Sequence, residues 1–196
     1  MQKIILASQS PRRKMLLEWA EVPFKVIVKH STEDFPPGTP PQEAAIFVAT
    51  QKAYAVQADA LERSETRTKE LQYLPVLAAD TMVVLNGQII GKPISRLEAL
   101  ETLAQLSGQT HEVVTGVCIL HQQRVISFAD VTRVTFHTLT PEQIEYYVDK
   151  YQPYDKAGAY AIQEWIGVVG IKGIEGDFYN VMGLPVSRVL QALEKL

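Results

Sequence analysis

The sequence predicts an α/β protein, because short apolar runs typical of strands alternate along the chain with longer stretches that have helical spacing. Strands are expected at the apolar run that follows Lys3 and at 24–28, 74–85, 88–90, 111–120, 125–129 and 131–136. Helices are expected at 11–19, 41–58, 95–106, 140–151 and 185–196. With 196 residues, of which 46% are hydrophobic, the chain is long enough for one well-packed domain or two small lobes.

Several of these elements carry signals at their ends. Ser10 followed by Pro11 is typical of a helix N-terminus, as is the run 140–143, Thr-Pro-Glu-Gln. Asn86-Gly87 predicts a tight hairpin. The glycine-rich segment 166–172 is expected to form a strand and turn. Charged residues across 59–74 predict an exposed helix end and a connector.

The helices at 41–58 and 95–106 are expected to contribute apolar side chains to the core. The candidates are Phe47, Val48 and Tyr54 on the first helix and Leu97, Leu100, Leu103 and Leu106 on the second.

Composition excludes some classes of function. The net charge of −3 provides no basic excess for general nucleic-acid binding. The single cysteine, Cys118, allows no internal disulfide and fits a reducing compartment. No signal peptide and no apolar run long enough to span a bilayer are visible, so we expect a cytoplasmic protein without a membrane partner.

The start of the first helix carries two cations where acidic residues are usual. Arg12 and Arg13 follow the N-terminal Pro11, at the positive end of the helix dipole. An anion would relieve this repulsion, and backbone N–H groups with two guanidinium groups can bind phosphate. Alternatively, both arginines point into solvent.

An acid interrupts the most apolar strand. Asp80, followed by Thr81, lies within 74–85, and a buried acid is tolerated where it is paired, metal-bound or functional. A structural carboxylate bonded to backbone is the alternative. After the Asn86-Gly87 hairpin comes Gly91-Lys92-Pro93, which is expected to place a cation beside Asp80.

Other polar residues have two interpretations each. The adjacent Glu33 and Asp34 can bind a divalent metal or form a solvated acidic loop. Lys52 is a lone helical lysine, which is usually a surface residue. His111 can contact phosphate, although a structural or exposed histidine is more common. In the small-residue run 155–163, the Gln163 amide can recognise the edge of a base.

Taken in order, these residues resemble one known family, the Maf nucleoside triphosphate pyrophosphatases. The matching blocks span nearly the whole chain. They are Ser8-Gln9-Ser10-Pro11-Arg12-Arg13, Ala78-Ala79-Asp80-Thr81, Gly91-Lys92-Pro93, Leu106-Ser107-Gly108-Gln109-Thr110-His111, Asp155-Lys156-Ala157-Gly158-Ala159-Tyr160 and Asn180-Val181-Met182-Gly183-Leu184-Pro185.

The resemblance implies a single domain over 1–196 with an ITPase-like fold. That fold has a long curved mixed β-sheet flanked by helices, in two lobes with a central cleft. The implied reaction converts a nucleoside triphosphate into its monophosphate and pyrophosphate, with Mg or Mn as cofactor. The 155–163 run looks like the branch that acts on dTTP and UTP, although Ala161 stands where that branch often has Gly. Modified pyrimidine nucleoside triphosphates are also candidate substrates, and the implied role is housecleaning of the nucleotide pool. Family members commonly form homodimers.

The resemblance also implies roles for individual residues. Asp80 matches the proton acceptor, and Lys52 and Lys92 are carried over as catalytic cations. Glu33 and Asp80 are carried over as metal ligands. The positions matched to substrate binding are Ser8, Arg12, Arg13, Thr81 and Gln163, of which Arg12, Thr81 and Gln163 are linked to substrate choice.

Two alternatives remain open at this point. One is a pyrophosphatase with another base preference, such as 7-methyl-GTP or other non-standard nucleotides. The other is a nucleotide-responsive regulator of septum formation and cell division that binds a partner without turnover.

Overall fold

The computed structural model describes residues 2–66 and 71–196, which divide into two compact units. Unit 1 comprises Met1–Asp80, Thr115–Asp130 and Gly183–Leu196, and unit 2 comprises Thr81–Val114 and Val131–Met182. Part of the predicted charged connector, 67–70, lies outside the described residues.

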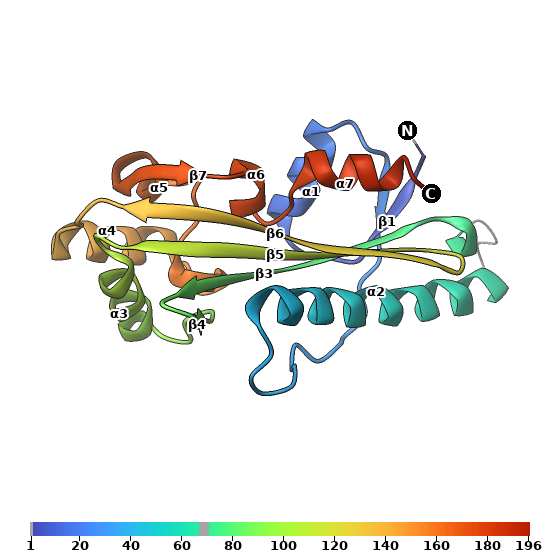
Figure 1. The fold of residues 1–196 in the computed structure, drawn as a ribbon, viewed down its shortest axis with the longest axis horizontal. Helices are drawn as coiled ribbons and strands as arrows, with labels where there is room; N and C mark the ends of the chain where they lie inside the picture. The colour runs from blue at the N-terminus through green and yellow to red at the C-terminus, as the bar shows by residue number, and fades with distance from the viewer. Residues whose placement is uncertain (1, 67–70) are drawn as a thin grey trace. The chain divides into compact units, whose positions relative to one another are not determined.

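Unit 1 packs helices against strands. Its elements are β1 (Ile4–Leu6), α1 (Pro11–Trp19), β2 (Phe24–Val26), α2 (Pro41–Thr66), the 3-10 turn η1 (Leu71–Tyr73), the first half of β3 (Val76–Leu85), adjoining parts of β5 (Thr110–His121) and β6 (Arg124–Phe136), and α7 (Val186–Leu193). Strand β1 pairs in parallel with both β2 and β3. Within this unit, α2 lies on one side of the strands and α1 and α7 on the other (Figure 1).

Unit 2 contains the remaining parts of β3, β5 and β6 with shorter elements around them. These are β4 (Gln88–Ile90), α3 (Arg96–Leu106), α4 (Pro141–Tyr151), the 3-10 turn η2 (Ala157–Ala159), α5 (Trp165–Gly170), β7 (Ile171–Glu175) and α6 (Phe178–Val181). Strands β4 and β7 pair antiparallel with β3 and β6, respectively.

The strands form one mixed sheet in the order β2-β1-β3-β5-β6-β7, with β4 also paired to β3. Parallel pairs at β1 and antiparallel pairs at β4 and β7 make it mixed. The predicted α/β class, with a mixed sheet flanked by helices, is therefore confirmed.

The core of unit 1 depends on small residues of α2, and this corrects one expectation. Phe47 and Tyr54 are exposed, whereas Val48 is fully buried as predicted. Alanines on the same face are buried instead, and a Cβ on Gly116 of β5 would come within 2.2 Å of the Ala45 carbonyl carbon. The backbones approach so closely that large α2 side chains are excluded from this contact.

Other expectations also need correction. Leu97 is exposed on α3, while Leu103 and Leu106 are fully buried. The segment 165–170 is helical rather than extended, because the Gly167 and Val168 N–H groups both bind the Glu164 carbonyl. The strands predicted at 125–129 and 131–136 are a single strand, β6.

The predicted element ends are largely confirmed. The Ser10 Oγ accepts from the Arg13 N–H at 3.4 Å, and Thr140 forms a full capping box with Gln143. Asn86 and Gly87 both have positive φ, as a tight hairpin requires.

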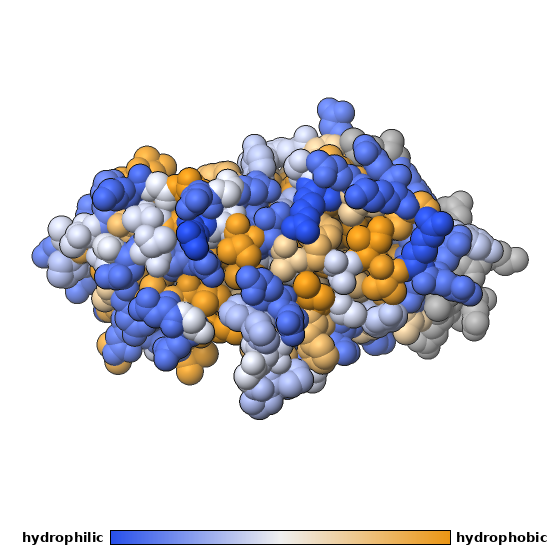
Figure 2. All heavy atoms as spheres, viewed as in Figure 1, coloured by the Kyte–Doolittle hydropathy of each residue, from blue (hydrophilic) through white to orange (hydrophobic). Residues whose placement is uncertain are grey.

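The surface mixes polar and apolar side chains. Figure 2 shows hydrophobic residues interspersed among hydrophilic ones over the visible face. Large apolar residues at the surface include Ile94 and Val168. Across 2–66 and 71–196, none of the helices combines the length and the apolar character needed to cross a membrane.

Candidate active site

The central feature of unit 1 is an ion-pair cluster of Glu33, Lys52 and Asp80, called here the acid–lysine cluster. The Lys52 Nζ lies 2.7 Å from the Glu33 Oε1 and 2.7 Å from the Asp80 Oδ1. Both distances are those of charge-assisted hydrogen bonds. One ammonium group thus offsets the mutual repulsion of two carboxylates.

Three different elements supply this cluster. Glu33 comes from the loop after β2, Lys52 from the middle of α2, and Asp80 from β3. The side chains of Lys52 and Asp80 are only 18% and 14% exposed, whereas that of Glu33 is 54% exposed. The surface interpretation of Lys52 is therefore wrong. The carboxylate in the apolar strand is paired with a cation and faces a partly open environment.

The helix-start arginines differ from each other. Arg13 is buried, its Nε donating to the Gly183 carbonyl at 2.8 Å and its Nη1 to the Ser8 Oγ at 3.2 Å, while Arg12 is half-buried. The alternative in which both point into solvent is wrong for Arg13. Ser8 also accepts from the Ser10 N–H at 3.2 Å, so the β1–α1 turn is ordered around the arginine.

The charges of unit 1 influence one another. Burial lowers the pKa of the Arg13 guanidinium; the negative charges of Asp80 and Glu33 oppose this shift, and the positive charge of Arg12 adds to it. Arginine keeps its proton at all ordinary pH values. Arg13 is thus a permanently charged and poorly hydrated cation, and it interacts electrostatically with the carboxylates of the acid–lysine cluster.

The acid–lysine cluster suits a hard divalent cation. Carboxylate oxygens are the donors that Mg²⁺ and Mn²⁺ prefer, and Mg²⁺ is commonly held by one or two carboxylates together with substrate phosphates and water. In the described parts of the chain, no three His, Cys, Asp or Glu residues gather into a metal cage. Glu33 and Asp80 fit the arrangement in which the protein supplies only two carboxylates. A bound cation would then compete with Lys52 for these two carboxylates.

The remaining predicted site residues belong to unit 2. Thr81 is half-buried on β3, and Gln163 is exposed on a turn before α5. Lys92 is exposed beyond the end of β4. The β3–β4 ladder ends at the pair Val83–Ile90, so Lys92 lies just past the end of the paired strands. Pro93 lacks the N–H that would extend a ladder.

A backbone contact fixes the segment that carries Lys92. The Gly158 N–H of η2 donates to the Gly91 carbonyl at 3.1 Å. Gly158 has a φ of +69°, and a Cβ there would lie 2.9 Å from the Val83 side chain. The small residues of the run 155–163 therefore allow close approach, and the group that approaches is another segment of unit 2.

His111 has the structural role that the sequence left open. It is buried, its Nε2 lies 2.7 Å from the Tyr160 hydroxyl, and its ring stacks on Phe136. Burial lowers the pKa of His111 to about 4 and raises the pKa of Tyr160. Both groups stay neutral near pH 7.

Sequence reasoning missed a polar network beside Gln163. The Tyr147 hydroxyl donates to the Glu164 Oε2, and the Lys156 Nζ lies 3.7 Å from the Glu164 Oε1. Tyr147 occupies the buried face of α4, where the sequence pattern makes it an ordinary core aromatic. The charge of Glu164, next to Gln163, was the available signal.

Known proteins match this chain over almost its full length. Residues 3–196 match the family model described as Maf-like protein. A dTTP/UTP pyrophosphatase of Porphyromonas gingivalis is 44% identical over 193 residues, covering 98% of this chain and 93% of its own. The dTTP/UTP pyrophosphatase of Cytophaga hutchinsonii is 46% identical, covering 98% and 84%. That of Bacillus mycoides is 43% identical, covering 100% and 96%.

The chain is also similar to proteins of known structure. The Ham1 protein of Staphylococcus aureus covers 99% of this chain and 98% of its own, with 16% identity and a TM-score of 0.48.

Proposed function

The chain belongs to the Maf-like protein family, and from this premise we propose that it hydrolyses dTTP and UTP to the monophosphate and pyrophosphate. The observation that carries the hydrolytic assignment is the acid–lysine cluster, in which a carboxylate on an apolar strand is held by an ammonium 2.7 Å away. The base preference rests on the relatives named dTTP/UTP pyrophosphatase, at 43–46% identity.

In this proposal Asp80 is the general base. It accepts a proton from the water that attacks phosphorus, while the anhydride bond between the α- and β-phosphates breaks and pyrophosphate leaves. Lys52 holds the carboxylate in place, and Arg13, with its buried guanidinium, stabilises the developing negative charge on phosphate. Ser8 orients Arg13 through the 3.2 Å hydrogen bond.

Unit 2 supplies the remaining groups of the proposal. Lys92 is a further phosphate cation, and Thr81 and Gln163 take part in the choice of base. The family resemblance links Arg12, which belongs to unit 1, to the same choice. We expect the two units to work as one domain, since the family match runs through both of them.

Glu33 and Asp80 would hold the Mg or Mn ion. When bound, this cation neutralises charge on the triphosphate oxygens. A chelator should therefore abolish turnover, and added Mg²⁺ or Mn²⁺ should restore it. Unchanged turnover in excess chelator would remove the metal from the proposal.

A substrate panel with product identification tests the function. The protein is incubated with dTTP, UTP, 7-methyl-GTP and ITP, and the products are separated. We expect monophosphate and pyrophosphate, with the pyrimidine pair preferred. Diphosphate with phosphate would reject the scissile bond, and a preference for 7-methyl-GTP or ITP would reject the base assignment. Binding without any turnover would favour the regulatory alternative.

We further propose a homodimer that acts in the cytoplasm, where nucleoside triphosphates are made and used. Sedimentation of the purified protein gives the assembly, and fractionation of the source cells gives the compartment. A monomer over the working concentration range would contradict the first expectation, and a protein recovered outside the cytoplasm would contradict the second.

A further inference from the structure

Gln163 is one of the two central residues of a turn, and the other central residue, Ile162, is buried. The Glu164 N–H donates to the Ala161 carbonyl at 3.1 Å, which closes the turn Ala161–Glu164. Ala161 and Ile162 are buried, whereas Gln163 is exposed. The direction of the Gln163 amide therefore depends on how firmly the two ends of this turn are held.

One hydroxyl group holds both ends. Tyr147, on α4, is fully buried, and its hydroxyl accepts from the Ala161 N–H at 3.1 Å. The same hydroxyl donates to the Glu164 Oε2. A phenol has one hydrogen to donate. The Tyr147 hydroxyl donates it to the Glu164 carboxylate, and its oxygen accepts from the Ala161 N–H.

Two more contacts limit the turn. The Lys156 Nζ, which also lies 2.7 Å from the Asp155 Oδ1, approaches the Glu164 Oε1 at 3.7 Å. A Cβ on Gly167 would lie 1.7 Å from the Ile162 carbonyl oxygen, so the turn packs directly on the backbone of α5. The Glu164 carboxylate is thus held from two sides, and the middle of the turn has little room to move.

We propose that Tyr147 is a positioning residue for base recognition, because its hydroxyl joins Ala161 and Glu164 and so fixes the turn that presents Gln163. This inference rests on the proposed role of Gln163 in selecting the base. It adds a residue that touches no substrate and acts only through the turn. The expected phenotype is a loss of discrimination between bases rather than a loss of hydrolysis.

Tyr147→Phe tests the proposal, since it removes the hydroxyl and keeps the ring that stacks on Tyr151. The ratio of kcat/KM for dTTP to that for ITP should fall about tenfold, the scale on which neighbouring hydrogen-bonded groups couple. A merely structural defect would lower both rates alike and leave the ratio unchanged, and that result would overturn the proposal.

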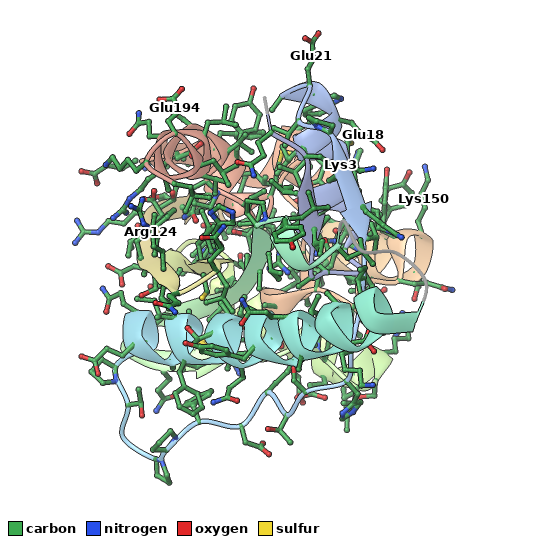
Figure 3. The ribbon with its side chains drawn as sticks, turned by 90° about the vertical axis from the view of Figure 1, so that its right-hand side faces the viewer. Lys3, Glu18, Glu21, Arg124, Lys150 and Glu194 are labelled. Atoms are coloured by element: carbon green, nitrogen blue, oxygen red, sulfur yellow. The ribbon has the colours of Figure 1, made fainter. Side chains whose placement is uncertain are left out.

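Tyr146→Phe is the matched control, because it removes the same atom from the adjacent residue of α4. The Tyr146 hydroxyl is exposed and accepts from the Lys150 Nζ at 2.7 Å. Figure 3 shows Lys150 projecting outward from the ribbon. This variant should keep the discrimination ratio of the unmodified protein, and a tenfold fall here too would mean that the effect is not specific to the turn.

Glu164 provides a second route should Tyr147→Phe fail to fold. Glu164→Ala removes the acceptor at one end of the turn and should lower the ratio similarly. Glu164→Gln keeps an oxygen that can accept from Tyr147, and it should retain more of the discrimination than Glu164→Ala. Equal, full discrimination in both variants would overturn the proposal.

Gln163→Ala separates the inference from the function on which it rests. If this variant keeps full discrimination, the role of Gln163 itself is wrong. If it loses discrimination while folded Tyr147→Phe retains it, the role of Gln163 stands and the positioning role of Tyr147 is wrong. In the double variant, Tyr147→Phe should add no further loss, because there is no longer an amide to orient.

Discussion

Asp80 and Lys52 illustrate how individual residues shape this protein. Each is largely buried, and each is the other's partner at 2.7 Å. Removing one member of such a pair is destabilising, because it leaves the other charge without compensation. A variant that keeps the hydrogen bond is therefore the appropriate probe of the chemistry.

Asp80→Asn is expected to lower kcat by about 10²- to 10⁴-fold, the usual contribution of a general base. The amide oxygen can still accept from Lys52 but the side chain no longer takes a proton, so dTTP binding should be largely preserved. Steady-state kinetics with Mg²⁺ or Mn²⁺ and a binding titration with dTTP measure the two quantities.

Asp149→Asn is the control for that experiment, since it makes the same chemical change in an exposed ion pair with Arg96. Its kcat should match that of the unmodified protein. The assignment of Asp80 as the base would be wrong if Asp80→Asn retained most of its rate.

His111 is expected to make the stability of the protein depend on pH in the acid range. Burial lowers its pKa to about 4 from the ordinary value of 6.5. Between these two values the unfolded chain binds a proton that the folded chain does not. The free energy of unfolding should therefore fall as the pH drops from 6.5 to 4, by about 3 kcal/mol from this residue.

His111→Gln, which keeps a polar atom near Tyr160, is expected to flatten that dependence. Denaturant unfolding at several pH values between 4 and 7 measures the free energies. The two proteins should differ in slope over this range. Parallel curves would show that His111 does not titrate as its buried position requires.

At the level of elements, the packing of α2 on β5 depends on one missing side chain. A Cβ on Gly116 would overlap the Ala45 carbonyl carbon at 2.2 Å, and this is backbone that cannot rotate away. Gly116→Ala should destabilise the protein by about 1–3 kcal/mol or more, as overpacking does. Thermal unfolding should show a fall in Tm of about 2–4 °C for each kcal/mol.

Gly173→Ala is the comparison for that change. Gly173 lies in β7, and a Cβ there would meet no atom within 4 Å. Its Tm should stay close to that of the unmodified protein. Equal losses in the two variants would show that close packing at Gly116 is not the cause.

The whole molecule carries a net charge of −3, with 19 basic and 22 acidic residues. Binding to the phosphate backbone of a nucleic acid needs clustered cations on the protein, which displace the counterions of the phosphates. We therefore expect no measurable affinity for duplex DNA at physiological salt, in contrast to dTTP with Mg²⁺. Fluorescence anisotropy with a labelled duplex provides the measurement, and salt-dependent micromolar binding would contradict the expectation.

How far the sequence predicts this molecule depends on whether a feature is local. The caps at Ser10 and Thr140 and the Asn86-Gly87 hairpin are encoded by neighbouring residues, so they were predicted correctly. Phe47 was placed in the core because it is large and apolar, but it is exposed, and Val48 and alanines of α2 are buried instead, with β5 approaching the backbone closely at Ala45.

The candidate site divides in the same way. The family resemblance pointed to Glu33, Lys52 and Asp80, but their positions along the chain did not reveal that one ammonium bridges both carboxylates. Nor did it reveal Tyr147, which in sequence is one more aromatic residue on a helix. Its partners at 161 and 164 are brought to it only by folding.

The sequence by itself determined the α/β class, the helix caps at Ser10 and Thr140, the Asn86-Gly87 hairpin and the family, since these follow from local spacing and from ordered motifs. The tertiary structure decided which charges pair, which apolar residues are buried and which hydroxyl holds the turn of Gln163. Those outcomes depend on distances between segments far apart in the chain, and only the folded backbone fixes such distances.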